Sequence, residues 1–413
     1  MQSARSSELA AILLAFASCV ALVSAQNTGR PQRASLDDGR PWLESDPDLS
    51  SDSTGLLRGA VATAFNDAPQ AETILRGVIR SQLGSDAATQ AHELLSRIYL
   101  RSGQYKRLIE NLDQWARSYP DRSEVSIEKI DIEQFRGLPD QINGPRRASI
   151  LRHAADDLTI PLSINGQPAT YLLDTGAWVS VMTESEATAF GLSIRATTGS
   201  LGDPSGRGVK VRTAVAKDVR VGAMRFQNVS FAILPNAEPW TSMSPGHRGI
   251  LGMPILLGLG QVRWSSGGTW NIGGTSESAV RTARNVVFSG NHLLLAALVE
   301  NKRVFGTLDT GAETTDLNAN FVAEFSDLVA QRGIPATREI IGVGGAASLE
   351  AMTLPELQFQ IDTARPVLRP AHVTLQRTAA LGGNCCIGNL GRDLLIQTGT
   401  FTLDFSRMTL RLQ

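Results

Sequence analysis

The triplet Asp-Thr-Gly occurs twice in this chain of 413 residues, at 174–176 and at 309–311. Each copy closes a short apolar run and is followed by an alanine. About eighty residues after each aspartate comes a segment that ends in Leu-Gly, at 250–252 and at 389–391, and strand-like alternation follows both. Recurrence in a fixed order over one long period indicates an internal duplication. Because two copies are too few for a solenoid, the sequence predicts a pair of pseudo-symmetric lobes.

The strings that carry the triplets, 173–177 and 308–314, resemble the active-site loops of retropepsin-like aspartic proteases. The Ile-Leu-Gly and Asn-Leu-Gly segments are similar to the element that passes beneath that loop in the family. The resemblance covers roughly residues 157–413. Retropepsins build their site from two chains, whereas pepsin-like enzymes carry both halves in one chain. The resemblance therefore implies a mainly β fold with two pseudo-symmetric β-barrel lobes, at 157–273 and 288–413.

The resemblance implies that Asp174 and Asp309 form the catalytic pair of an aspartic endopeptidase, which hydrolyses a polypeptide substrate with an activated water molecule. Two carboxyl groups about 3 Å apart cannot both ionise, so they share one proton. One group can then activate water while the other protonates the carbonyl oxygen, and the position of the proton decides which is the base. An acidic pH optimum is expected. The alternative for each triplet is a plain hairpin turn, because Asp and Gly both favour turns.

The other residues of the triplets are expected to support the pair. Gly176 and Gly311 allow a sharp turn and a close approach of the two loops, because neither residue carries a Cβ. By the resemblance, Thr175 and Thr310 hold the loops rigid with hydroxyl hydrogen bonds across the pseudo-twofold axis. Trp178, which follows the first loop, is interpreted as a core tryptophan, with a substrate subsite as the alternative.

Members of the family close a glycine-rich hairpin, the flap, over the substrate. The first lobe offers the region 198–211 as a flap candidate, and the second lobe offers a glycine-rich stretch at 342–345. Neither candidate carries the flap tyrosine of pepsin-like enzymes. The second-lobe candidate also matches a dinucleotide-binding fingerprint, but a proline at 355 and the alternation beyond it favour strands over the helix that such a site needs. That candidate consists of Gly342, Val343, Gly344 and Gly345.

Composition argues against several other functions. The 39 basic and 40 acidic residues give no electrostatic footprint for nucleic acid. The five histidines are scattered singly, without the spacing of metal ligands, so we expect no metal and no cofactor. We expect a monomer with an intramolecular pseudo-dimer, with pairing of halves from two chains as the alternative. A non-catalytic peptide-binding adaptor is the rival function.

Residues 1–25 indicate a signal peptide, with a positive Arg5, an apolar stretch and a small-residue cleavage motif that ends at Ala25. We therefore expect export to the periplasm or the extracellular space, with no membrane span after cleavage. Lipoprotein processing at Cys19 is the alternative. Residues 26–54 are polar and rich in Pro, Asp, Ser and Arg, which predicts a disordered linker.

The hydrophobic period becomes helical over residues 55–140. One apolar face precedes Gly103 and a second follows it, in an order that resembles a tetratricopeptide (TPR) helix pair. We predict a small all-α, TPR-like domain that contacts a protein partner. The alternative is a pro-segment that places Arg146, Arg147 or Arg152 against the two aspartates.

Two cysteines, Cys385 and Cys386, are adjacent in the sequence. A disulfide between neighbouring residues closes a strained ring, so we expect two buried thiols that pack as small apolar side chains. A bridge between the two residues is the alternative.

Overall fold

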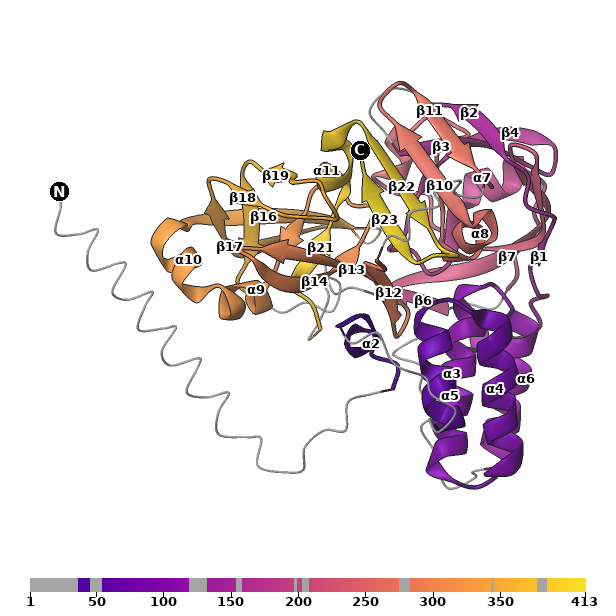
Figure 1. Cartoon of the computed structure of the whole chain (residues 1–413). Helices are drawn as coiled ribbons and strands as arrows, with labels where there is room; N and C mark the ends of the chain where they lie inside the picture. The colour runs from indigo at the N-terminus through magenta and orange to yellow at the C-terminus, as the bar shows by residue number, and fades with distance from the viewer. Residues whose placement is uncertain are drawn as a thin grey trace. The chain divides into compact units, whose positions relative to one another are not determined.

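The fold is mainly β, and a group of helices precedes the strands along the chain (Figure 1). Among the described residues, no helix is both long enough and apolar enough to cross a membrane. The expected signal peptide and most of the expected linker lie outside those residues. The computed structural model describes residues 36–44, 54–118, 132–153, 158–196, 199–202, 208–274, 283–342, 345–376 and 385–413.

Residues 36–44 differ from the disordered linker that the sequence predicts. They form a turn and the short helix α2 (Arg40–Glu44). The main-chain N–H of Gly290 donates to the carbonyl oxygen of Asp37 at 2.9 Å, and Trp42 packs against the main apolar core. The prediction of disorder is therefore wrong for this stretch, because one tryptophan and a distant strand hold it despite its polar composition.

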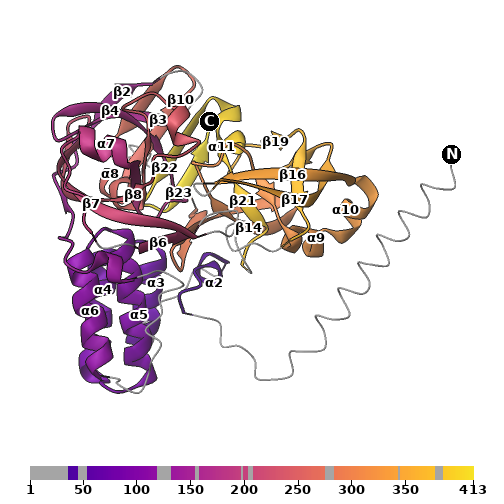
Figure 2. The same cartoon turned by 180° about the vertical axis from the view of Figure 1, so that it is seen from behind.

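Four helices pack side by side in both views (Figures 1 and 2). Side-chain oxygens of Thr54, Asp67 and Ser85 cap the first three helices by accepting main-chain N–H groups. Gly103, with a φ of +70°, makes the turn into the fourth. The helical period that the sequence predicts is confirmed, and the TPR-like character stays a prediction. The helices are α3 (Gly55–Ala64), α4 (Ala68–Ser81), α5 (Asp86–Arg101) and α6 (Tyr105–Ser118).

Buried contacts join these helices to the strands. Val61 and Phe65 belong to the same apolar core as the strand residues. The buried guanidinium group of Arg101 lies 4.0 Å from the ring centre of Phe288 in strand β12 (Val286–Ser289). The helical segment is therefore integrated into the main core and shares apolar side chains with it.

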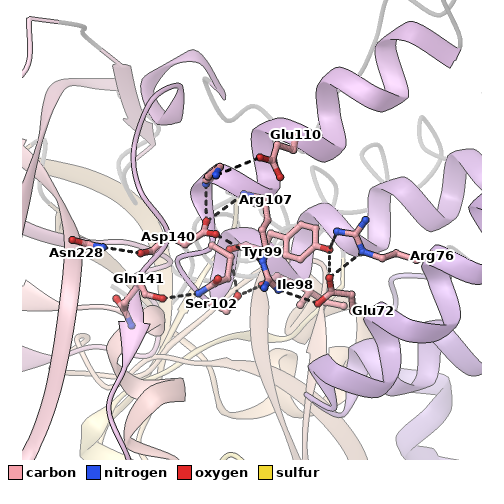
Figure 3. A network of polar contacts seen from close by, with 12 residues as sticks. Glu72, Arg76, Ile98, Tyr99, Ser102, Arg107, Glu110, Asp140, Gln141 and Asn228 are labelled. Atoms are coloured by element: carbon pink, nitrogen blue, oxygen red, sulfur yellow. Dashed lines mark hydrogen bonds and ion pairs between the residues drawn. The ribbon is translucent and has the colours of Figure 1, made fainter.

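A polar network also connects the helices with the strands (Figure 3). Glu72 accepts a hydrogen bond from the hydroxyl of Tyr99 at 3.0 Å and pairs with Arg107 at 3.2 Å. Arg107 in turn lies 3.8 Å from the carboxylate of Asp140. Asn228, in strand β8 (Met224–Leu234), donates to the carbonyl oxygen of Asp140 at 3.3 Å. The network thus runs from α4 to β8.

The first eight-stranded sheet has the order β1-β8-β5-β9-β4-β3-β7-β6. A further pairing of β7 with β8 closes six of these strands into a barrel. Every second residue of β3 is buried, so one face of the strand fills the interior. The strands are β1 (Ile142–Asn143), β3 (Thr159–Ile164), β4 (Gln167–Leu173), β5 (Ser180–Thr183), β6 (Gly199–Gly202), β7 (Gly208–Val221), β8 and β9 (Gly249–Leu251).

The second eight-stranded sheet has the order β12-β13-β14-β21-β15-β20-β17-β16. Its central pairing repeats that of the first sheet: β21 is parallel to β14 and antiparallel to β15, as β9 is to β4 and β5. The strands beyond β12 are β13 (His292–Val299), β14 (Lys302–Leu308), β15 (Asp316–Leu317), β16 (Ile334–Gly342), β17 (Gly345–Leu354), β20 (Ala371–Thr374) and β21 (Gly388–Leu390).

A five-stranded sheet, in the order β2-β11-β10-β22-β23, contains strands that precede residue 275 and strands that follow residue 399. β10 and β22 pair antiparallel, and Trp264 stacks on Phe401 across that pairing at 5.8 Å. The strand-like alternation seen downstream of each Leu-Gly segment is confirmed. The strands are β2 (Ser149–Arg152), β10 (Gln261–Ser265), β11 (Thr269–Ile272), β22 (Thr400–Asp404) and β23 (Thr409–Leu412).

The basic residues of the pro-segment alternative lie in or beside this sheet. Arg152 is part of β2, and the carbonyl oxygen of Arg147 lies against Gly273. Arg146 donates to the carbonyl oxygens of Leu257 and Gly258, both at 3.3 Å. The interpretation that places these arginines against the aspartates is therefore wrong, because they help to build the sheet that joins the two halves.

Short elements fill the remaining connections. Single helical turns and short helices follow the ends of several central strands, and a two-residue strand pair lies near the end of the chain. These elements are η1 (Ile132–Phe135), α7 (Glu184–Ala189), η2 (Trp240–Ser242), α8 (Met253–Leu259), α9 (Ala319–Glu324), α10 (Ser326–Arg332), β18 (Leu357–Gln358), β19 (Val367–Leu368), α11 (Arg392–Leu395) and η4 (Ile396–Thr398).

Candidate active site

The two Asp-Thr-Gly loops begin where two corresponding strands end. Asp174 follows β4, and its main-chain N–H donates to the carbonyl oxygen of Leu251 at 3.0 Å. Asp309 follows β14, and its N–H donates to the carbonyl oxygen of Leu390, also at 3.0 Å. Each aspartate is therefore held by the strand that carries the Leu-Gly segment of its own half.

Reciprocal hydrogen bonds join the two loops. The hydroxyl of Thr175 donates to the carbonyl oxygen of Leu308 at 2.6 Å and accepts the N–H of Thr310 at 3.0 Å. The hydroxyl of Thr310 donates to the carbonyl oxygen of Leu173 at 2.6 Å and accepts the N–H of Thr175 at 3.0 Å. Both threonines are buried. The cross-linking that the resemblance implies for these residues is present in the geometry.

Each triplet glycine lies against the carboxyl group of the opposite loop. A Cβ on Gly176 would lie within 3.0 Å of all three atoms of the Asp309 carboxyl group, and a Cβ on Gly311 would be equally close to that of Asp174. No L side chain could occupy either position without moving an aspartate. The structure thus brings the two predicted aspartates together across two glycines within one chain.

The environment of the pair favours a shared proton. Asp174 Oδ1 accepts the N–H groups of Gly176 at 2.7 Å and Ala177 at 3.2 Å. Burial, the charge of Asp309 and a hydrogen bond with it raise the pKa of Asp174 well above its usual range. All three causes act against a negative charge on Asp174. The site therefore favours a protonated Asp174 beside the carboxyl group of Asp309.

Asn389 is a residue of this site that the sequence analysis does not single out. Its side-chain amide donates to Asp309 Oδ2 at 2.6 Å, while Asp309 Oδ1 accepts the N–H groups of Gly311 at 2.9 Å and Ala312 at 3.1 Å. The sequence did contain one signal for this residue: the segment at 389–391 begins with an asparagine, whereas the matching segment of the first half begins with Ile250.

The Leu-Gly segments pass behind the loops, as the resemblance implies. The N–H of Gly252 donates to the hydroxyl of Ser180 at 3.0 Å, and the N–H of Gly391 donates to the hydroxyl of Thr315 at 3.0 Å. A Cβ on Gly391 would collide with the main chain of Thr314. Both glycines are therefore required for the close approach of main chains behind the aspartates.

The second-lobe flap candidate is the end of a β-hairpin. β16 and β17 pair antiparallel up to Gly342 and Gly345, and a strand follows the glycines in place of the helix that a dinucleotide site needs. Val343 and Gly344 lie outside the described residues. The first-lobe candidate is also hairpin-shaped, because β6 and β7 pair up to Gly202 and Gly208, with 203–207 outside the described residues.

Trp178 connects the first loop with the helical segment. Its side chain is partly buried, packs against the core of the helices and meets the ring of Phe135 edge-on, with 5.8 Å between ring centres. This placement fits the core interpretation. In the part of the chain that the structure describes, no cluster of three His, Cys, Asp or Glu residues could hold a metal ion.

The expectation of two thiols is wrong for the adjacent cysteines. Cys385 and Cys386 form a disulfide, with their Cα atoms 3.8 Å apart. The carbonyl oxygen of Cys386 accepts the side-chain amides of Asn318 and Asn320 at 3.0 and 2.9 Å, and Arg40 donates to that of Cys385 at 2.5 Å. These bonds hold the main chain on both sides of the bridge, which the sequence pattern could not reveal.

Comparison with known proteins links the first half of this site to one family. Residues 160–255, less than half of the chain, match the model of a family described as aspartyl protease. No curated protein matches the sequence. The matched region contains the first aspartate loop and the Ile-Leu-Gly segment behind it.

Two solved structures are similar to parts of the chain. A retropepsin-like aspartic protease from Rickettsia conorii is 17% identical, with a TM-score of 0.23, over 32% of this chain and 93% of that one. The retroviral protease-like domain of Ddi1 from Leishmania major is 16% identical, with a TM-score of 0.17, over 25% of this chain and 78% of that one.

Proposed function

We propose that this protein is an exported aspartic endopeptidase whose catalytic residues are Asp174 and Asp309. The observation that carries the proposal is the meeting of two carboxyl groups across Gly176 and Gly311, with four hydrogen bonds fixing their loops. A displacement near 1 Å at a catalytic group can lower a rate on the order of 100-fold, so rigid loops favour catalysis.

The reaction follows from one proton shared by two carboxyl groups. The charged carboxylate takes a proton from water as the water oxygen attacks the peptide carbonyl carbon, and the protonated carboxyl gives its proton to the carbonyl oxygen. The resulting diol collapses as a proton passes to the nitrogen, which breaks the C–N bond and releases an acid and an amine. No covalent intermediate is required. The active form is the singly protonated pair, so activity should show a bell-shaped pH dependence.

The proposed enzyme has two pseudo-symmetric lobes, at 157–273 and 288–413, within a monomer. The repeated central pairing of β4, β5 and β9 with β14, β15 and β21 supports this arrangement. The helices α3–α6 form a TPR-like segment that contacts a protein partner. Their shared core with the strands, through Val61 and Phe65, supports permanent attachment over a removable pro-segment.

The test is cleavage of an unstructured protein between about pH 3 and 7 by the parent and by Asp174→Asn and Asp309→Asn. We expect each substitution to lower kcat by on the order of 100-fold or more, because each removes one of the two proton carriers. Asp362→Asn, an exposed turn residue with a φ of +53°, is the matched control and should keep full activity.

Equal activity in all four proteins would rule out the pair as the catalytic centre. A parent that binds unfolded peptides but cleaves none at any pH would favour the peptide-binding adaptor. The same preparations, sized by light scattering at low concentration, would test the monomer.

A further inference from the structure

The two aspartates differ in one neighbour that the strand register identifies. Ile250 of β9 and Asn389 of β21 occupy the same position, each opposite the residue that precedes the aspartate by two on the parallel strand. The first half therefore has a hydrocarbon side chain at the strand position where the second half has the amide that donates to Asp309. The pair is thus chemically unequal although its loops are built alike.

The inequality appears in the hydrogen bonds that each carboxyl group accepts. Asp174 accepts two main-chain N–H groups from its own loop. Asp309 accepts two of the same kind and a third from Asn389 Nδ2, at 2.6 Å. Asn389 is only 7% exposed, so water competes little for this bond. Hydrogen bonds donated to a carboxylate favour its charged form, and the third bond therefore favours the negative charge on Asp309.

The main chain holds Asn389 in this position. Its strand lies between β14 and β15, and Asn389 is opposite Thr307 on one side and Asp316 on the other. Gly388, directly before it, lies against the main chain of Asp316 and Leu317. These contacts keep the main chain of Asn389 between β14 and β15, where its amide reaches Asp309.

The charged residues on the elements around the pair are bound elsewhere. Asp316 pairs with Arg338 at 2.7 Å, and Glu313 with Arg392 at 3.4 Å. Asp393 accepts the hydroxyl of Thr315 at 2.6 Å. Among the described residues, the titratable or charged groups on β14, on β15, on α11 and in the loop between Asp309 and β15 are Lys302, Arg303, Glu313, Asp316, Arg392 and Asp393. His372 of β20 and Arg338 of β16 lie beside Asp316, and Asp174 lies across the pair.

We propose that Asn389 is a positioning residue that keeps the negative charge of the pair on Asp309 and the proton on Asp174. This inference rests on the proposed endopeptidase function. Asp309 is then the base that takes a proton from water, and Asp174 is the acid that protonates the peptide carbonyl oxygen. The chain thus assigns fixed roles to two residues that the duplication made alike.

The test compares pH profiles of kcat for the parent and Asn389→Ile, which gives the second half the side chain of the first. The variant loses a hydrogen bond to a charged group, so the pH midpoint of the acidic limb of its kcat profile should rise by about one to two units. The midpoint of the alkaline limb should stay within a few tenths of a pH unit, because the lost hydrogen bond is to Asp309, whereas the proton lost in this limb is the one that the proposal places on Asp174. The active range therefore narrows from the acid side only.

A purely structural role for Asn389 predicts a different result, namely a lower rate at every pH with both limbs in place. That outcome, with a parent that cleaves substrate, would overturn the inference and leave the proposed function intact. Ile250→Asn is the reciprocal variant. A second amide should stabilise the charged form of Asp174 and lower the alkaline limb by about one unit. An unmoved alkaline limb in a folded Ile250→Asn protein would also count against the inference.

A second measurement does not depend on turnover. NMR of the aspartate side-chain ¹³C carboxyl groups reports the protonation of the pair directly, including in a protein that cleaves nothing. In Asn389→Ile the lower titration step should move up by about one to two units, and in the exchange variant Ile250→Asn/Asn389→Ile it should return toward the parent value. A lower step that stays fixed in both variants would contradict the assignment. If the lower step shifts in Asn389→Ile but the parent cleaves no substrate, the endopeptidase proposal is refuted while the charge placement stands.

Discussion

The substitution Thr310→Val tests whether the crossed hydrogen bonds hold the two loops together. The hydroxyl of Thr310 donates to the carbonyl oxygen of Leu173 at 2.6 Å and accepts the N–H of Thr175 at 3.0 Å, and the side chain is fully buried. Valine keeps the shape and leaves two buried main-chain groups without these partners. Each such group costs about 1–3 kcal/mol, so the variant should lose about 2–6 kcal/mol of unfolding free energy.

The assay is urea unfolding, with stability taken from the midpoint and slope, together with kcat on the unstructured substrate. We expect kcat to fall by on the order of 100-fold, because loosened loops misplace the carboxyl groups. Thr402→Val, a partly exposed position in β22, is the matched control and should change stability by no more than about 0.5 kcal/mol. If both variants lose equally little stability, the loops are held by other contacts and this reasoning fails.

Three further predictions concern the aspartate pair and the disulfide. Gly311→Ala should reduce kcat by on the order of 100-fold in a folded protein, since the new Cβ displaces the Asp174 carboxyl group; full activity would show that the glycine contact is not tight. Because the pKa of Asp174 is raised above 3.8 in the folded chain, protonation favours folding, and this stability is present below about pH 3.8 and lost as the pH rises through the folded pKa. The asparagine of Asp174→Asn cannot ionise, so the Tm of this variant should rise relative to that of the parent from pH 4 to 7. A Tm difference between the two proteins that stays constant over this range would argue against the raised pKa. Iodoacetamide should leave Cys385 and Cys386 unlabelled in unfolded, unreduced protein and label both after reduction, as peptide mass spectrometry would reveal; labelling without reduction would disprove the bridge.

The sequence patterns predicted the central strands and loops well, because these features depend on short-range chemistry. Apolar runs before Asp174 and Asp309 form β4 and β14, and the glycine-rich stretch that ends at Gly345 joins two strands. The same patterns missed the order at 36–44. The order there depends on how Trp42 packs against strands far along the chain, and composition carries no information about that contact.

Asn389 and the disulfide were missed for a related reason. In the sequence, Asn389 is the first residue of the Asn-Leu-Gly segment that resembles the element beneath the loop, and only the register between β21 and β14 brings its amide to Asp309. The cysteine prediction relied on the strain of the ring that a bridge between neighbouring residues closes. In the structure, the Cα atoms of Cys385 and Cys386 are 3.8 Å apart. Two amides and a guanidinium group bind the carbonyl oxygens of these two residues.

The residues alone indicate that two matched loops exist, that each begins with an aspartate, and that glycines allow each loop to approach another surface. The pairing of distant strands was needed to show that two threonines 135 positions apart exchange hydrogen bonds, and that Asp309 receives an amide from a position that holds isoleucine in the other half. Local spacing fixes the face of a strand on which a side chain lies. The partner of that side chain depends on which distant strand pairs beside it, and long-range packing sets that choice.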